Sequence, residues 1–311
     1  MKVSIIGSGQ VGATTALYIA ERGLADITLI DIIEGMPQGK ALDLMEANPL
    51  RGFAVRVVGS NSYKDIAGSE LIVVTAGVAR RPGMSRADLL EKNVAIVRMV
   101  VENVVKYCPS AKILVVTNPV DAMTYLALKA SGFGRERVFG MAGVLDSARF
   151  RYFLAEGLGV SASDTTAMVI GSHDEQMVPL PQYSRVRGVP ITDLMSDEDI
   201  KRVIERTRQA GSEIVRYLKA GSASFAPAAS ICEMVEAIIQ DKKELLPVSV
   251  YLEGEYGLRD LCIGVPAKLG REGIEQIVEL ELTLKEREAL HRSARALKER
   301  IGMIDKRQPL L

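Results

Sequence analysis

A glycine-rich stretch and an aspartate near the N-terminus carry the first chemical signal. Residues 7–12 have the sequence GSGQVG, directly after an apolar segment and at the start of a helical pattern. Gly7 suits a tight turn, Gly9 the close approach of the main chain to a pyrophosphate, and Gly12 close packing of a helix on a strand. Asp31 ends the next apolar segment, at the spacing at which a carboxylate binds both ribose hydroxyls and repels a 2′-phosphate. The pattern predicts a dinucleotide site that prefers NAD to NADP.

A histidine with polar neighbours in the sequence is the second chemical signal. The chain has two histidines, and His173 lies in GSHDEQMVP (171–179), between an apolar run and a proline. An imidazole changes charge near neutral pH, so it can exchange a proton with a substrate. Taken alone, a histidine at a strand end is more often structural. The other histidine, His291, lies on a charged helix and is expected to be a solvated surface residue.

Short apolar segments alternate with helical patterns through the first half of the chain. The segments are continuously apolar, which is typical of parallel strands covered on both faces. A helix is expected from Ser85, which with Asp88 resembles a capping box, as far as Pro109. We predict an α/β fold with a doubly wound parallel (Rossmann) sheet over residues 1–143.

The second half, residues 144–311, no longer alternates strictly and predicts an α+β substrate domain with some antiparallel sheet. A helical pattern covers 145–160, strands are expected around 167–171 and 248–253, and long charged helices near 196–219 and 283–301. No flexible linker separates the halves. We expect them to pack directly, with a cleft between them.

Composition excludes several classes of function. Lys plus Arg equals Asp plus Glu at 39 each, so no overall field attracts nucleic acid or an anionic membrane. No apolar stretch reaches the roughly 20 residues that span a bilayer, and no signal peptide is evident. Cys108, Cys232 and Cys262 have no paired spacing, so we expect no metal site, no disulfide and a cytoplasmic protein.

Three further stretches place polar residues at the ends of expected strands or helices, where open parallel sheets bind ligands. They are TAGVARRPGMSRADLL (75–90), VTNPVD (116–121) and LDSARFR (145–151). Together with GSGQVGA, Asp31 and the stretch around His173, they resemble the lactate and malate dehydrogenase family, in particular its lactate-dehydrogenase-like malate branch. The resemblance covers essentially the whole chain in order and spacing.

The resemblance implies roles for five side chains. In that family a histidine paired to an aspartate moves a proton, and His173 and Asp146 match that pair. Arg149 matches the arginine that binds the substrate's C1 carboxylate by two hydrogen bonds. Arg86 matches the arginine that polarises the reacting carbonyl, and Asn118 the asparagine that binds the substrate near the nicotinamide. The Asn118-Pro119 bond is a candidate for cis geometry.

Substrate preference is expected to depend on Arg80. Relatives that reduce pyruvate have glutamine at this position, whereas relatives that reduce oxaloacetate have arginine, followed by the pattern that RRPGM reproduces. A guanidinium compensates the second carboxylate of oxaloacetate or malate, and pyruvate would leave it unpaired. Ala223, where pyruvate-specific relatives often have threonine, leaves room for the longer diacid. The resemblance therefore implies reversible oxidation of (S)-malate to oxaloacetate, a step of the tricarboxylic acid cycle.

The resemblance also implies a set of cofactor-binding residues and an assembly. The predicted NAD-binding residues are Gly7, Gly9, Gln10, Val11, Gly12, Asp31, Thr75, Ala76, Gly77, Asn93, Val116 and Asn118. Members of the family are usually homodimers or homotetramers, and we expect the same here.

Three alternatives stay open at this stage. A lactate dehydrogenase, or another 2-hydroxy-acid dehydrogenase, is disfavoured by Arg80. An NAD-dependent glycosidase needs a cysteine and a histidine together as metal ligands, and no cysteine lies near His173 in the sequence. A binding module that retains NAD without catalysis has no need of a proton relay.

Overall fold

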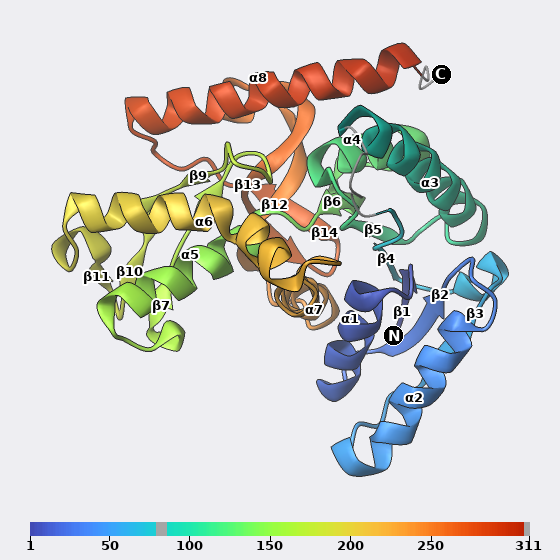
Figure 1. The fold of residues 1–311 in the computed structure, drawn as a ribbon. Helices are drawn as coiled ribbons and strands as arrows, with labels where there is room; N and C mark the ends of the chain where they lie inside the picture. Colours follow the sequence, from blue (N-terminus) through green and yellow to red (C-terminus); the bar gives the residue numbers. More distant parts are fainter. Residues whose placement is uncertain (79–85, 308–311) are drawn as a thin grey trace.

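One large sheet organises the chain (Figure 1). The structure, a computed structural model, describes residues 1–78 and 86–307, without the side chains of 86–88 and 304–307. In this part of the chain, nine strands form the sheet in the order β14-β13-β12-β6-β5-β4-β1-β2-β3. The parallel strands are β1 (Lys2–Ile6), β2 (Asp26–Ile30), β3 (Val57–Ser60), β4 (Leu71–Val74), β5 (Lys112–Val115) and β6 (Val138–Gly140). Their apolar runs are largely buried, as both-face coverage requires.

The order of the parallel strands places a switch point between β1 and β4. The chain builds outward from β1 to β2 and β3 on one side, and from β4 to β5 and β6 on the other. Ligands of such sheets bind at the carboxyl ends of the strands beside this point. The segments that begin at Gly7 and Thr75 meet there, since the Thr75 N–H donates to the carbonyl of Ile6 at 2.9 Å.

Helices cover both faces of the parallel strands. They are α1 (Gln10–Glu21), α2 (Met36–Arg51), α3 (Arg86–Tyr107) and α4 (Val120–Ser131). α1 contacts α2 and α3 packs along α4, so two pairs lie on opposite sides of the sheet (Figure 1). The helix expected from Ser85 to Pro109 is α3; Ser85 itself lies outside the described residues.

The sheet does not stop at the boundary between the halves. β13 (Arg259–Gly270) pairs antiparallel with β12 (Glu244–Glu253) on one side and with β14 (Gly273–Ile277) on the other. Ser249 of β12 pairs with Gly140 of β6 and so joins them to the parallel strands. The expected antiparallel sheet is thus present, but it extends the first sheet instead of forming a separate one.

The other elements of the second half surround β12 and β13. The helices are α5 (Gly143–Leu158), α6 (Asp197–Leu218), α7 (Phe225–Ile239) and α8 (Leu284–Arg307). Short strands are β7 (Thr165–Thr166), β8 (Val169–Ile170), β9 (Val178–Pro179), β10 (Arg185–Val186) and β11 (Val189–Pro190). Short 3-10 helices are η1 (Tyr63–Ile66), η2 (Arg135–Arg137), η3 (Ala162–Asp164), η4 (Pro181–Tyr183), η5 (Ile191–Asp193) and η6 (Glu255–Gly257). α8 runs along one edge of the molecule, from the β9 side to α4 (Figure 1).

The largest apolar core follows the sheet through both halves. It includes β1 residues such as Ile5, α4 residues such as Met123 and β13 residues such as Ile263. A smaller apolar cluster includes Phe150 of α5 and Ile200 of α6. Across residues 1–78 and 86–307, no helix combines the length and apolarity needed to span a bilayer.

Candidate active site

The turn after β1 has the shape of a phosphate cradle. Gly7 has φ +103°, and a Cβ there would lie 2.7 Å from the Ala76 nitrogen. A Cβ on Gly12 would lie 1.9 Å from the carbonyl oxygen of Gly7, whereas one on Gly9 would meet nothing within 4 Å. No side chain caps α1, so the N–H groups of its first turn, which begins at Gln10 and Val11, keep their capacity for an anion. The turn fits the pyrophosphate of a dinucleotide.

Asp31 stands beside this turn. Its Oδ2 accepts hydrogen bonds from the Ser8 N–H at 2.8 Å and the Ser8 hydroxyl at 3.1 Å, and its Oδ1 accepts one from the Ile33 N–H at 3.0 Å. The residue remains partly exposed. These bonds hold a carboxylate at the end of β2, where it can accept from ribose hydroxyls and repel a 2′-phosphate.

Two side chains, Thr75 and Asn93, hold the main chain that follows β4, across the switch point from Asp31. The Thr75 hydroxyl donates to the carbonyl of Gly7 at 2.9 Å. Asn93 of α3 is 1% exposed; its Oδ1 accepts from the Val78 N–H at 2.8 Å, and its Nδ2 donates to the Asn118 carbonyl at 2.7 Å. Asn93 thus links the segment after β4 to the segment after β5. Its contact with a cofactor, like that of the buried Val116, stays a prediction.

Asn118 lies at the entrance to α4. Its bond to Pro119, which the sequence offered as a candidate for cis geometry, is cis. The side chain is exposed and follows β5 at the same sheet edge as Thr75 and Gly77. The structure therefore brings the predicted cofactor segments and Asn118 to one edge.

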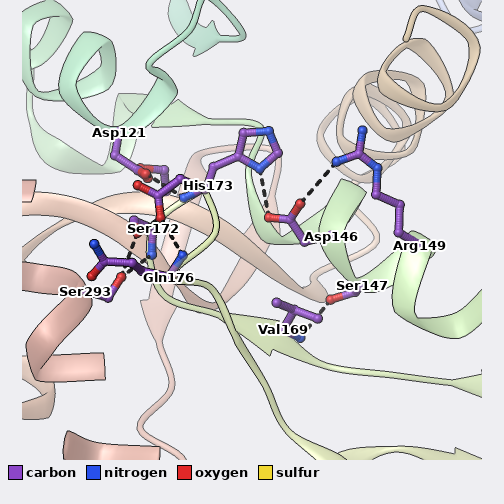
Figure 2. A network of polar contacts seen from close by, with 11 residues as sticks. Asp121, Asp146, Ser147, Arg149, Val169, Ser172, His173, Gln176 and Ser293 are labelled. Carbon is purple, nitrogen blue, oxygen red and sulfur yellow. Dashed lines mark hydrogen bonds and ion pairs between the residues drawn. The ribbon is translucent and has the colours of Figure 1, made fainter. Parts of the chain in front are cut away.

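His173 and Asp146 form a close pair (Figure 2). His173 Nδ1 lies 2.8 Å from Asp146 Oδ2, with 13% and 2% of the side chains exposed. Asp146 lies in the first turn of α5, and His173 follows β8. Burial lowers the pKa of His173, but the charge of Asp146 and its hydrogen bond raise that pKa above its ordinary value overall. The carboxylate therefore fixes Nδ1–H and leaves Nε2 for another partner.

Arg149 lies one turn beyond Asp146 on α5. Its Nη1 is 3.7 Å from Asp146 Oδ1, and its side chain is 14% exposed. Its Nε has no hydrogen-bond partner among the described residues, and neither has Asp146 Oδ1. Burial lowers the pKa of Arg149, and the charge of Asp146 opposes this. A largely buried guanidinium whose Nε has no partner, close to an imidazole, is suited to bind a carboxylate.

Asp121 is a buried member of this cluster that the sequence reasoning missed. Its Oδ2 accepts from the main-chain N–H of His173 at 2.8 Å, and its Oδ1 from the Ser249 hydroxyl at 2.6 Å. Burial raises its pKa to about 6, although these hydrogen bonds lower it. The signal was present, since Asp121 ends the VTNPVD stretch three positions after Asn118.

Several predicted residues are not placed in this cluster by the structure. Arg80 lies outside the described residues, and of Arg86 only the main chain, at the start of α3, is described. Ala223 lies half-buried just before α7. The prediction for His291 was wrong, because it is half-buried and its Nε2 donates to the carbonyl oxygen of Tyr256 at 3.0 Å.

Both halves of the chain match domains of the same protein family. Residues 1–140 match the profile of the lactate/malate dehydrogenase NAD binding domain, and residues 143–307 that of the lactate/malate dehydrogenase alpha/beta C-terminal domain. Malate dehydrogenase of Thermomicrobium roseum is 57% identical over 298 residues, 96% of each chain. That of Bacillus subtilis is 52% identical over 299 residues, also 96% of each.

Solved structures of malate dehydrogenases and of lactate dehydrogenases are both similar to the structure of this chain. Malate dehydrogenase from Picrophilus torridus has a TM-score of 0.95 and 46% identity, covering 98% of this chain and 97% of that one. Lactate dehydrogenase from Cryptosporidium parvum, solved with lactic acid and cofactor, has a TM-score of 0.94 and 42% identity, covering 98% of both chains. The fold alone thus does not separate the two substrates. With two matching domain profiles over almost its full length, this chain belongs to the lactate/malate dehydrogenase family.

Proposed function

We propose that this protein is an NAD-dependent malate dehydrogenase that interconverts (S)-malate and oxaloacetate. The observation that carries the proposal is the His173–Asp146 pair with the guanidinium of Arg149, whose Nε has no hydrogen-bond partner, one turn away. The similarity to malate dehydrogenases at 50% identity and above supports the choice of substrate.

The proton transfer is assigned to His173. Asp146 holds the Nδ1–H, so Nε2 is left to face the oxygen on the reacting carbon when substrate is bound. In malate oxidation the neutral imidazole takes the hydroxyl proton, and in oxaloacetate reduction the imidazolium returns it. The raised pKa of His173 favours the imidazolium, so reduction is expected to be faster below that pKa and malate oxidation above it.

NAD, when bound, supplies the hydride acceptor, and its reduced form the donor. The turn from Gly7 to Gly12 would hold the pyrophosphate, and Asp31 the ribose hydroxyls. Thr75, Ala76, Gly77 and Asn118 line the same edge and would meet the nicotinamide end. The uncapped turn and the partly exposed carboxylate of Asp31 support this assignment and the preference for NAD over NADP.

Substrate recognition is assigned to three arginines. Arg149 would bind the C1 carboxylate through two N–H groups, Arg86 would polarise the carbonyl, and Arg80 would pair with the second carboxylate. Asn118 would complete the site. For Arg80 and Arg86 the support is sequence resemblance, and for Arg149 it is also the unused Nε.

Steady-state oxidation of NADH tests the proposal, with oxaloacetate and pyruvate compared at equal concentrations. A large preference for oxaloacetate is expected, because pyruvate leaves the Arg80 charge unpaired. A preference for pyruvate would overturn the assignment of Arg80 but keep the relay. Turnover of neither substrate would contradict the catalytic proposal.

We also propose a cytoplasmic homodimer or homotetramer that serves the tricarboxylic acid cycle, with a domain boundary near residue 143. Large side chains stay exposed at Tyr217, Leu218 and Phe225, which is typical of subunit interfaces. The three cysteines are free and buried, which suits a reducing compartment. Light scattering after gel filtration measures the assembly, and a monomer at micromolar concentration would contradict it.

A further inference from the structure

Helix α8 holds the loop that carries His173. The main-chain N–H of Ser172 donates to the Ser293 hydroxyl at 2.9 Å, and the two hydroxyl oxygens lie 2.7 Å apart. Both serines are buried, with 2% of Ser172 and 0% of Ser293 exposed. Figure 2 shows this pair on the side of His173 away from Asp146. A hydroxyl on α8 thus satisfies the buried N–H immediately before His173.

The same helix also holds the residue after His173. Arg300 Nη2 lies 2.7 Å from Asp174 Oδ2, and Asp174 Oδ1 accepts from the Ser172 hydroxyl at 2.7 Å. Burial raises the pKa of Asp174, but its hydrogen bonds and Arg300 lower that pKa below its ordinary value. Asp174 is therefore a carboxylate near neutral pH, and the contact with Arg300 is an ion pair.

Ser293 and Arg300 act from one face of a well-anchored helix. They lie about two turns apart and so point to the same side of α8. Leu290, Leu297 and Ile301 bury α8 against the core, and the helix contacts β13 and α4. The position of α8 is therefore fixed by its packing against the core, and the loop around His173 is bonded to this fixed helix.

We propose that Ser293 and Arg300 are positioning residues, through which α8 holds the residues on both sides of His173, by the main-chain N–H of Ser172 and the carboxylate of Asp174, and keeps the imidazole against Asp146. Removal of the Ser293 hydroxyl leaves the buried N–H of Ser172 without its acceptor, and the loop must shift to satisfy it. The consequence for catalysis rests on the proposed function. The effect on the contact between His173 and Asp146 is independent of that function. This contact influences the pKa of His173, which is measured without substrate.

The test is an NMR titration of the full-length protein with ¹³C-labelled histidine. Two histidines give two imidazole signals, and His173→Asn assigns them. In Ser293→Ala we expect the pKa of His173 to fall by about half a pH unit or more, since the ring loses part of its contact with Asp146. We expect kcat to fall about tenfold with an unchanged KM for NADH, the pattern for a residue that acts through the proton carrier.

Ser69→Ala is the matched control. It removes one hydroxyl from another buried serine pair, Ser4 and Ser69, whose oxygens lie 2.7 Å apart in the nucleotide-binding half. We expect it to leave the pKa of His173 and kcat unchanged. An equal pKa of His173 in Ser293→Ala, Ser69→Ala and the wild type would overturn the proposal.

Arg300 provides a second, less buried position in case Ser293→Ala does not fold. Arg300→Gln is expected to lower the pKa of His173 by a smaller amount, and Arg300→Lys to retain the wild-type value. No change in Arg300→Gln would then overturn the proposal. A shifted pKa in an enzyme that turns over neither oxaloacetate nor pyruvate would contradict the proposed function and leave the positioning role standing.

Discussion

The nucleotide turn and the cluster around His173 differ in how far apart their parts lie along the chain. The turn uses main-chain groups and glycines from residues 7–12, with Asp31 one strand later. The cluster uses side chains of α4, α5, β12 and α8 around a loop after β8. One site is encoded locally and the other only by the complete fold.

Because of this difference, the two sites tolerate different kinds of substitution. Dense main-chain packing around Gly7 and Gly12 leaves no room for a Cβ, so shape decides what fits there. Around His173 the ionisable side chains of Asp121 and Asp146 are buried, and that of Arg149 is 14% exposed. Charge and hydrogen bonding therefore decide function there. Substitutions at the two sites should fail in different ways.

His173→Asn is expected to have the largest effect on turnover. Loss of the proton carrier should lower kcat about 10³-fold, within the range for general acid–base groups, while NADH binding persists. Stopped-flow turnover and fluorescence titration with NADH measure the two properties. Loss of NADH binding as well would show that the two sites are not separable and that His173 is structural.

Arg80→Gln is expected to change specificity by about a hundredfold. Without the guanidinium, the second carboxylate of oxaloacetate loses its partner and pyruvate no longer leaves a charge unpaired. The ratio of kcat/KM for oxaloacetate to that for pyruvate measures the effect, with Arg81→Gln as the neighbouring control. A ratio equal to that of the control would remove Arg80 from the substrate site.

Gly12→Ala and Gly9→Ala are expected to separate folding from cofactor binding at the nucleotide turn. The Gly12 Cβ would overlap the Gly7 carbonyl oxygen, so the unfolding free energy should fall by about 1–3 kcal/mol. The Gly9 Cβ meets nothing, so stability should change by less than about 0.5 kcal/mol while NADH affinity falls about tenfold.

Urea unfolding and NADH titration distinguish these outcomes. Gly39→Ala, in α2 where a Cβ also meets nothing, is the control for the NADH titration. Wild-type NADH affinity in Gly9→Ala would contradict the pyrophosphate cradle.

The contrast between the sites also explains what the sequence predicted. The turn and Asp31 follow from local spacing, and the parallel sheet from continuous apolar segments. The pairing of His173 with Asp146, 27 positions apart, came only from family resemblance. The contact of Ser172 with Ser293, 121 positions apart, had no local signal at all. The prediction for His291 was wrong because its partner is the main-chain carbonyl of Tyr256, and a pattern of side chains cannot predict such a contact.

Continuation of the sheet through Ser249 and Gly140 was also not predictable from segment patterns. An apolar strand has the same pattern whether it extends one sheet or begins another. Yet this junction places Ser249 against Asp121, so the boundary between the halves helps to build the cluster.

Asp121→Asn is expected to have the smallest effect among these substitutions, and it concerns stability against pH. The folded-state pKa of Asp121 is raised to about 6, so the folded protein holds this proton more tightly than the unfolded chain. The stabilisation is therefore complete below the unfolded pKa, about 4, and is lost as pH rises through about 6. His173, whose pKa is also raised, acts in the same direction, whereas Asp174, whose pKa is lowered, acts in the opposite one. Comparison of the variant with the wild type isolates the contribution of Asp121.

Between pH 5 and pH 7 the wild type should lose about 1 kcal/mol more unfolding free energy than Asp121→Asn. Urea unfolding of both proteins at a series of pH values measures this difference. Parallel curves would mean that Asp121 titrates at its ordinary pKa. The carboxylate would then be better solvated than its burial beside Ser249 indicates. The charge of Asp121 would contribute less to the cluster around His173, and that cluster would differ less from the nucleotide turn, where shape decides what fits.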